Sequence, residues 1–166
     1  MTVDELMTGL VPDGAFEGFS TADDMVLAID FSNAAVSPGA YIAAQAGITE
    51  QSGQLAAQTQ DAQYLRTGQV TVKTGTSRSF TVNGDRYNSD PFQDEILAHS
   101  MKYGTGQAVI RPYVYFNMLT GKGEQGSISI VVEDDLAGAA GENASFSAAL
   151  TSTTKPVEYT FTPATP

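Results

Sequence analysis

The chain has 166 residues, of which 42% are hydrophobic and 16% are charged, and it contains no cysteine. These values exclude an intrinsically disordered chain, a disulfide framework and a thiolate metal site, and they fit one globular domain. The formal net charge is −11, and residues 1–65 contain no lysine or arginine. A surface this acidic repels phosphate backbones, which disfavours sequence-specific nucleic-acid binding. We also expect neither a secretory signal nor a membrane partner, because no apolar run is long enough for either role.

The first half of the chain combines strand signals with segments that have no apolar periodicity. Residues 1–19 are expected to form an N-terminal arm, because their glycines and Pro12 leave room for only one or two helical turns. Alternation over 25–31 predicts a half-buried strand, and 41–48 is the next candidate strand. Residues 49–68 are rich in Gln, Ala, Thr and Ser with few charges. They predict a long polar loop suited to lying against another protein surface.

The second half is dominated by short strand-like runs. Alternation returns at 70–72 and 80–82, and Asn83-Gly84-Asp85 predicts a turn. Four further strand-like runs follow between residues 109 and 161, where aromatic and β-branched residues alternate with small polar ones. The remaining residues, 163–166, are expected to form a short C-terminal tail.

One helix is predicted at about 90–103. Asp90 can act as its N-cap, Pro91 suits the first helical position, and Gly104 ends it. The sequence therefore predicts a mainly β fold, a two-sheet β-sandwich or partly closed barrel with one flanking α-helix. We expect a single domain over 20–162, between the arm and the tail.

The residues needed for catalysis are scarce, and we do not expect an enzyme. The single histidine, His99, falls within the predicted helix, where a packing or surface role is more common than catalysis. Residues 121–126 match the G-x-G-x-x-G pattern of dinucleotide sites, but they join two strand-like runs and no helix follows. No catalytic residue, cofactor or metal site is therefore predicted.

Three stretches carry a resemblance to a known family. They are residues 41–49 with the polar stretch that ends at Tyr64-Leu65, residues 80–86 running into 90–97, and residues 126–130 followed by 143–150. In their order and spacing, residues 20–162 resemble the tail tube proteins (major tail proteins) of long, non-contractile-tailed phages and related phage-tail-like particles. The resemblance covers most of the chain and includes no catalytic signature.

The resemblance implies a structural subunit of a virion tail, assembled in the host cell cytoplasm. Hexameric rings would stack into a hollow tube through which phage DNA passes into the host without specific binding. The implied partners are copies of the same chain, a tape-measure protein, a tail terminator and distal tail proteins. Some family members carry an additional immunoglobulin-like domain, which we do not expect in this chain.

Two sets of residues are predicted to serve this assembly. The first set, polar and apolar residues of the stretch near 49–68, would contact the adjacent ring: Thr49, Gln51, Gln54, Leu55, Gln58, Tyr64 and Leu65. The second set, acids from the base-free first 65 residues, would keep DNA away from the walls: Asp23, Asp24, Asp30, Glu50 and Asp61.

Two alternatives stay open at this point. The same subunit could form the tube of a phage-tail-like bacteriocin or another injection device. A different class of protein, an acidic β-sandwich module for carbohydrate binding or adhesion, would be expected to expose a cluster of aromatic side chains. The tyrosines are instead scattered along the chain, and tryptophan is absent.

Overall fold

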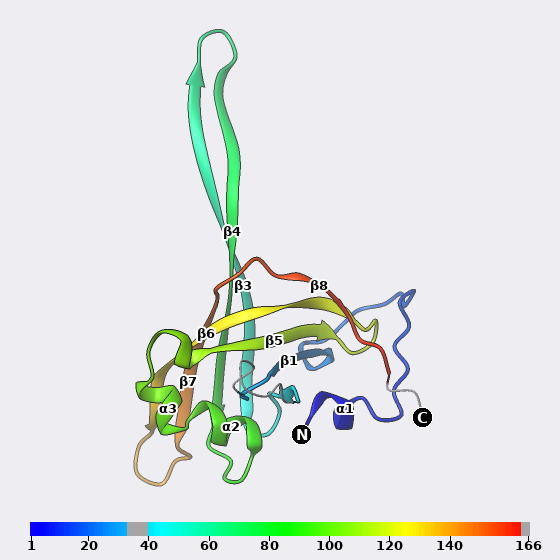
Figure 1. Cartoon of the computed structure of the whole chain (residues 1–166), viewed down its shortest axis with the longest axis vertical. Coiled ribbons are helices and arrows are strands. Elements are labelled where there is room, and N and C mark those ends of the chain that lie inside the picture. Colours follow the sequence, from blue (N-terminus) through cyan, green and yellow to red (C-terminus); the bar gives the residue numbers. More distant parts are fainter. Residues whose placement is uncertain (33–39, 164–166) are drawn as a thin grey trace.

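A computed structural model describes residues 1–32 and 40–163, so the tail predicted at 163–166 lies almost entirely outside the described residues. The chain is mainly β, with short helices at its beginning and middle (Figure 1). In chain order its elements are α1 (Val3–Leu6), the 3-10 helix η1 (Ala22–Asp24), β1 (Met25–Ile29), β2 (Ile42–Ala43), β3 (Ile48–Tyr64), β4 (Gly68–Asp85), α2 (Pro91–Ile96), α3 (His99–Tyr103), the 3-10 helix η2 (Gly106–Val109), β5 (Ile110–Asn117), β6 (Lys122–Ala137), β7 (Ser145–Ser152) and β8 (Val157–Thr160).

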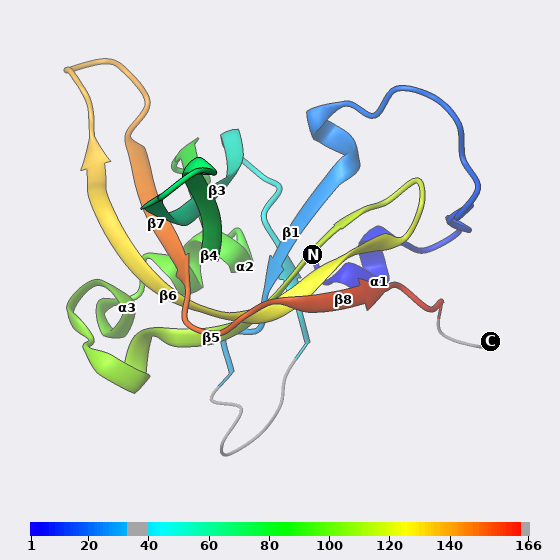
Figure 2. The same cartoon turned by 90° about the horizontal axis from the view of Figure 1, so that it is seen from above.

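A single antiparallel sheet with the order β2-β1-β5-β6-β7-β4-β3 bends into two layers at β6. The first part of β6, Gly123–Gln125, lies between β5 and β8, whereas from Ile130 onward β6 pairs only with β7. The view from above shows the bend, with β1, β5 and β8 on one side and β7, β4 and β3 on the other (Figure 2). The predicted mainly β, sandwich-like fold is thus confirmed, with one continuous, unclosed sheet in place of two separate sheets.

The main core fills the space between these two layers. Its members are apolar side chains that point inward from both layers, together with residues of the α2–α3 region that closes one side: Leu27, Ile29, Phe31, Phe80, Val82, Phe92, Ile96, Leu97, Met101, Val109, Tyr113, Ile128, Ile130, Phe146, Ala148 and Leu150. Edge-to-face ring contacts such as Phe80–Tyr113, with centroids 5.3 Å apart, add to the burial.

A second core lies on the opposite face of β1 and β5. Val26 and Ala28 of β1 pack there against Val3, Met7 and Phe161. The strand predicted at 25–31 is therefore buried on both faces, and the half-buried expectation was wrong because both ends of the chain return to cover the outer face. Part of the segment predicted as an arm thus contributes apolar side chains to a core.

The predicted loop at 49–68 is instead most of a long β-hairpin, and this prediction was wrong. Its backbone groups are paired in the ladder between β3 and β4, from Ile48–Gly84 to Tyr64–Gly68. The expected turn at Asn83-Gly84-Asp85 was also wrong, because these residues end β4. Gly84 is needed there for close packing, since a Cβ atom at that position would lie 2.6 Å from the Gly47 carbonyl oxygen.

The helix predicted at 90–103 is two short helices, α2 and α3. The predicted cap is present, since the Asp90 carboxylate accepts a hydrogen bond from the Gln93 backbone N–H at 3.0 Å. The chain leaves helical geometry at Ala98, which adopts an extended backbone before α3 begins. Gln93 is fully buried, and its side-chain amide donates to the carbonyl oxygens of Ala46 and Asp85.

Candidate assembly surfaces

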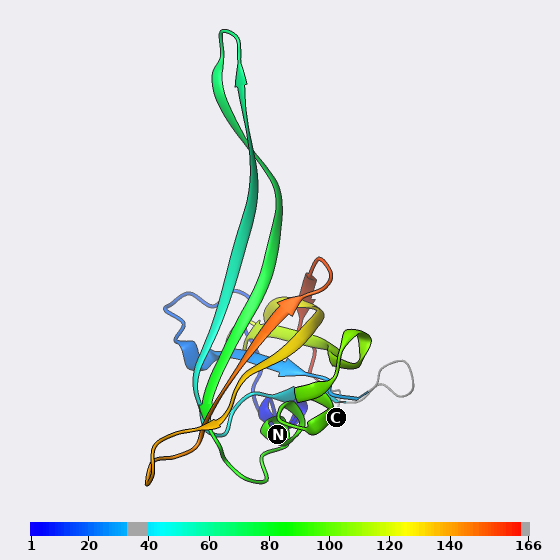
Figure 3. The same ribbon diagram turned by 90° about the vertical axis from the view of Figure 1, so that its left-hand side faces the viewer.

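The β3–β4 hairpin extends far beyond the rest of the domain (Figures 1 and 3). β4 pairs with β7 only from Ser79 to Asp85. Above the Gln54–Ser79 pair, the two strands therefore bond only to each other among the residues that the structure describes. At about 3.3 Å per residue, this free part is roughly 35 Å long. An isolated two-stranded hairpin is marginally stable in water, so a partner surface is expected to stabilise this one.

The two faces of the free hairpin differ in charge. Successive side chains alternate between faces, and Arg78, Lys73 and Asp61 lie on the face that continues from the core residue Phe80. The opposite face carries no charge and becomes apolar toward the tip. It exposes the side chains of Tyr64, Val70 and Val72, with Ala62 half-buried among them, and Leu65 in the adjacent turn is 92% exposed. Exposed apolar surface of this kind marks a binding region.

Arg78 fixes the root of the hairpin to the sheet. Its Nε donates to Glu124 Oε1 at 2.7 Å, and its side chain is only 12% exposed. The guanidinium carbon lies 4.5 Å from the centre of the Phe80 ring and 5.2 Å from that of Tyr115. Tyr113 donates its hydroxyl to the same Glu124 oxygen at 3.1 Å. Burial, and secondarily the Glu124 charge, raises the pKa of Tyr113 well above its usual value.

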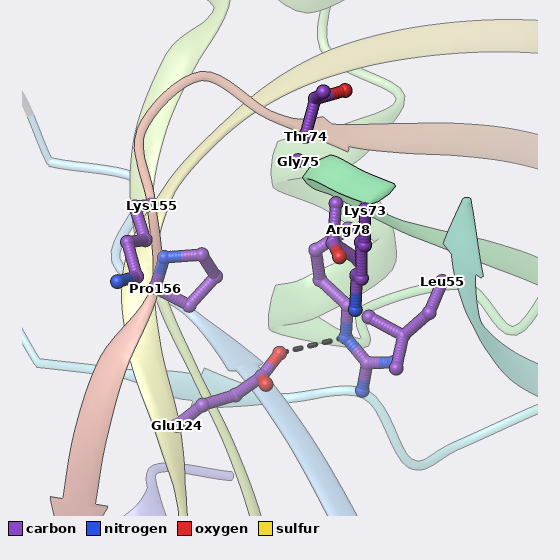
Figure 4. Close-up of a pocket in the computed structure, with 9 residues that line it drawn as sticks. Leu55, Lys73, Thr74, Gly75, Arg78, Glu124, Lys155 and Pro156 are labelled. Carbon is purple, nitrogen blue, oxygen red and sulfur yellow. Dashed lines mark hydrogen bonds and ion pairs between the residues drawn. The ribbon is translucent and has the colours of Figure 1, made fainter. Parts of the chain in front are cut away.

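A groove of about 590 Å³ runs beside this root, between the hairpin and the segment that leads into β8. Its lining includes Leu55, Lys73, Glu124, Lys155 and Pro156 (Figure 4). The dashed contact from Glu124 to Arg78 marks the groove's only ion pair among the residues drawn.

Two strand edges are free at opposite sides of the second layer, which has the order β6-β7-β4-β3. Within the described residues, β3 pairs only with β4, and β6 beyond Ser129 pairs only with β7. Unpaired edges are templates for pairing with another chain. One row of outward side chains, Ser52, Thr81, Ala149 and Val131, crosses all four strands from edge to edge.

This layer is also free of positive charge. Its strand segments, residues 48–54, 79–85, 126–137 and 145–152, contain no lysine or arginine. The acids in these segments are Glu50, Asp85, Glu133, Asp134 and Asp135. Of these, Asp135 forms an ion pair with Lys102, whose Nζ lies 2.7 Å from Asp135 Oδ2.

The predicted contact residues divide into two groups. Thr49 and Gln51 bond within the chain, to the carbonyl oxygens of Asn83 and Met25, both at 3.2 Å. Gln54 lies at the boundary between the sheet and the free part of the hairpin. It pairs with Ser79, the residue of β4 nearest the tip that also pairs with β7. The other four lie on the projecting hairpin, where they are exposed: Leu55, Gln58, Tyr64 and Leu65.

The five predicted acids do not share one surface. Asp23 and Glu50 line the same groove of about 400 Å³, at the base of β3. Asp24 accepts a hydrogen bond from the Thr21 backbone N–H and so caps η1. Asp30 is only 4% exposed and accepts hydrogen bonds from Ser32, while Asp61 lies near the tip of the hairpin.

Sequence reasoning missed the Arg78–Glu124 pair and the groove beside it. The partners are 46 residues apart, and no local pattern connects them. Residues 1–32 and 40–163 contain no group of three or more His, Cys, Asp or Glu side chains placed to hold a metal ion. The described helices are also too short or too polar to cross a membrane.

Solved structures with the same fold come from gene transfer agent (GTA) particles. The chain matches one from the tail of an empty GTA particle with C6 symmetry, with a TM-score of 0.60 and 19% identity, covering 86% of this chain and 100% of the other. It matches another from the virion of a native GTA particle, with a TM-score of 0.58 and 18% identity, covering 84% and 98%. No protein-family model and no curated protein matches the sequence. The likeness therefore establishes a shared fold.

Proposed function

We propose that this chain is a non-enzymatic structural subunit of a phage-like tail. Six copies form a ring, and the rings stack into a hollow tube that DNA crosses into the host. Two comparisons support this proposal. The fold matches that of a chain in a C6-symmetric GTA tail over the full length of that chain. The sequence independently resembles tail tube proteins over residues 20–162.

The observation that carries the ring proposal is the pair of free edges on the second layer. If the β3 edge of one copy bonds to the β6 edge of the next, each edge is covered and the sheet continues from copy to copy. The two edges belong to different strands, so the contact is heterologous, and such contacts close into rings when the rotation between copies allows it. Closure covers both free edges of this layer.

In the same arrangement the long hairpin contacts the adjacent ring. Within residues 1–32 and 40–163, its uncharged face and apolar tip have no partner, and a neighbouring ring would supply one. We assign this contact to Gln58 and Tyr64, which lie on the uncharged face, and to Leu65 in the adjacent turn. Leu55 pairs with Arg78 and so lies on the charged face, outside this contact. The tape-measure, terminator and distal tail proteins would complete the tail.

DNA passage is supported by the charge of the second layer. A lumen lined by segments without lysine or arginine offers no strong binding site to phosphate, so DNA slides instead of sticking. Glu50, Glu133 and Asp134 would supply the repulsion. Asp30 is too buried for this role. Replacing the three acids by lysine should make assembled tubes retain DNA, and retention unchanged from the unmodified tube would contradict the charge mechanism.

Engineered cysteines test the ring, because the natural chain has none. Ser52 and Val131 lie on opposite edges in one outward row. In one copy they are separated by three strand spacings, roughly 14 Å, which a disulfide cannot bridge. The variant that combines Ser52→Cys with Val131→Cys should therefore cross-link only between copies. Two further variants, in which Glu50→Cys or Gln54→Cys replaces Ser52→Cys, allow for a different register between the two edges.

Oxidation of the assembled variant should give a ladder of covalent species that stops at six chains. A matched control with cysteine at Ser52 and Glu142 should give no ladder, because Glu142 lies in the loop between β6 and β7. Absence of cross-links for every register in assembled protein would contradict edge-to-edge pairing. A ladder that stops at another number would contradict sixfold closure.

A further inference from the structure

The groove beside the hairpin root is basic, in contrast to the acidic character of the whole chain. Lys73 and Lys155 are exposed and line it together with the apolar residues Leu55 and Pro156. Within the described residues, neither lysine takes part in an ion pair. The one acid of the lining, Glu124, is already bonded to Arg78. The groove thus presents two ammonium groups without an acidic partner beside an apolar wall.

The segment between Leu10 and Thr21 is acidic and carries an exposed aromatic side chain. Between Leu10 and Thr21 the chain forms no helix or strand, and the Phe19 side chain is 101% exposed. Glu17 precedes it by two residues, and the whole of 1–65 lacks lysine and arginine. Aromatic side chains are enriched in protein–protein contacts, so a fully exposed Phe19 two residues from Glu17 can serve as the anchor of such a contact.

This segment is held in place as a projecting loop. The Asp13 backbone N–H donates to the Leu119 carbonyl oxygen at 2.8 Å, and Lys122 Nζ donates to the Gly14 carbonyl oxygen at 3.0 Å. At the other end, Asn117 donates to the Ser20 hydroxyl at 2.8 Å. The blue ribbon in Figure 2 shows the resulting loop standing away from the sheet. Because both ends are anchored, little backbone entropy is lost when the loop meets a partner.

We propose that residues 16–19 of one copy dock into the basic groove of a neighbouring copy. Phe19 packs against Leu55 and Pro156, and Glu17 lies between Lys73 and Lys155. The inference rests on the proposed function, since it requires copies to assemble, and it deepens that proposal by naming a second contact besides the sheet edges.

Charge and shape favour a second copy as the occupant. The loop and the groove are different patches of one chain, so their contact is heterologous and repeats from copy to copy. Opposite charges on the two patches accelerate association and reject wrong registers. In the single chain Phe19 is fully exposed, so its own groove does not hold it.

Mixed single-cysteine variants test the contact directly. Protein carrying Phe19→Cys is co-assembled with protein carrying Thr74→Cys, a groove residue, and then oxidised. A cross-linked heterodimer is expected, and it can form only between copies, because each chain carries one cysteine. The control mixes Phe19→Cys with Glu142→Cys, at an exposed position far from the groove in the sequence. Assemblies without the Phe19–Thr74 heterodimer, or with equal yields from both mixtures, would overturn the proposal.

Charge reversal gives a second, independent readout. Glu17→Lys should raise the concentration needed for assembly by about tenfold, and Lys155→Glu should do the same, because each places like charges in contact. The double variant should restore assembly to within about threefold of the unmodified chain. Melting temperatures should stay unchanged, since both side chains are exposed. A double variant no better than the worse single variant would overturn the pairing.

The outcome also separates this contact from the ring itself. Ladders from the Ser52–Val131 variant without any Phe19–Thr74 heterodimer would overturn the loop–groove contact and leave the proposed ring intact. Failure of the unmodified chain to assemble at any concentration would overturn both.

Discussion

The lower and upper parts of strand β4 show how one strand can serve two different purposes. From Phe80 to Gly84 every second residue is buried in the core, and β7 and β3 pair with both edges. From Gly68 to Arg78 the same strand has one partner, and its apolar residues Val70 and Val72 are exposed. The lower part stabilises the domain, whereas the upper part is the one that we propose to stabilise an assembly. The comparison predicts that substitutions in the lower part change the free energy of unfolding, whereas substitutions in the upper part change assembly.

The largest expected effect separates folding from assembly. A variant in which residues 56–77 are replaced by Asn-Gly keeps Leu55 opposite Arg78 and closes the hairpin with a two-residue turn. Its free energy of unfolding should stay within about 1 kcal/mol of the full chain, because no core residue is removed. Sedimentation velocity should nevertheless show no species larger than a single ring at any concentration, because the variant keeps the strand edges that close the ring and loses the hairpin that contacts the next ring. A variant that unfolds, or one that assembles normally, would contradict the division of roles.

Substitutions within β4 should reproduce the contrast at single residues. Phe80→Ala removes a ring that is 1% exposed and should cost about 3–5 kcal/mol in urea unfolding. Val72→Ala, on the exposed part, should change the free energy of unfolding by less than about 0.5 kcal/mol. If Val72→Ala destabilises the monomer as strongly as Phe80→Ala, the hairpin must pack against its own domain, contrary to this account.

The junction between the two parts depends on Arg78. Arg78→Gln leaves Glu124 without its cation and should cost about 1–3 kcal/mol. Arg66→Gln, in the hairpin turn, is the matched control and should have almost no effect. A double-mutant cycle with Glu124→Gln measures the coupling. A coupling near zero would show that the ion pair does not hold the hairpin root.

The smallest expected effect appears at alkaline pH. The pKa of Tyr113 is raised by burial and then by Glu124, so the folded state favours the neutral phenol. The resulting stability is present below the ordinary tyrosine pKa of about 10 and is lost as the pH rises above it. Tyr113→Phe should reduce the alkaline loss of stability by up to about 1.4 kcal/mol per pH unit. Urea unfolding at pH 9 to 11 checks this, and an unchanged slope would contradict it.

The core was predictable from sequence where burial leaves a periodic pattern. Phe80, Val82, Phe146 and Leu150 alternate with small polar residues, and the structure places all four in the main core. The N-cap of α2 was also predictable, because Asp90 lies directly before the first helical residue, Pro91. These signals are local, because one buried face is enough to impose a period on the sequence.

The hairpin was not predictable because neither of its faces is buried in the chain. Gln58, Gln60 and Ala62 carry no apolar period, so the segment resembles a loop although its backbone is fully paired. The same limit applies to Arg78 and Glu124, which meet only once the sheet has formed. For β1 the prediction underestimated burial, because the burial of its second face depends on α1 and Phe161, which are distant in the sequence. Residues whose partners lie far away, or on another copy, leave no local signal.

Negative-stain electron microscopy of the purified, concentrated chain tests the central claim most directly. The account predicts hollow tubes of stacked rings for the full chain, with six copies around each ring in end-on views. The variant without residues 56–77 should give no tubes under the same conditions. Solid or open filaments, rings of another order, or a full chain that stays monomeric at every concentration would contradict the account.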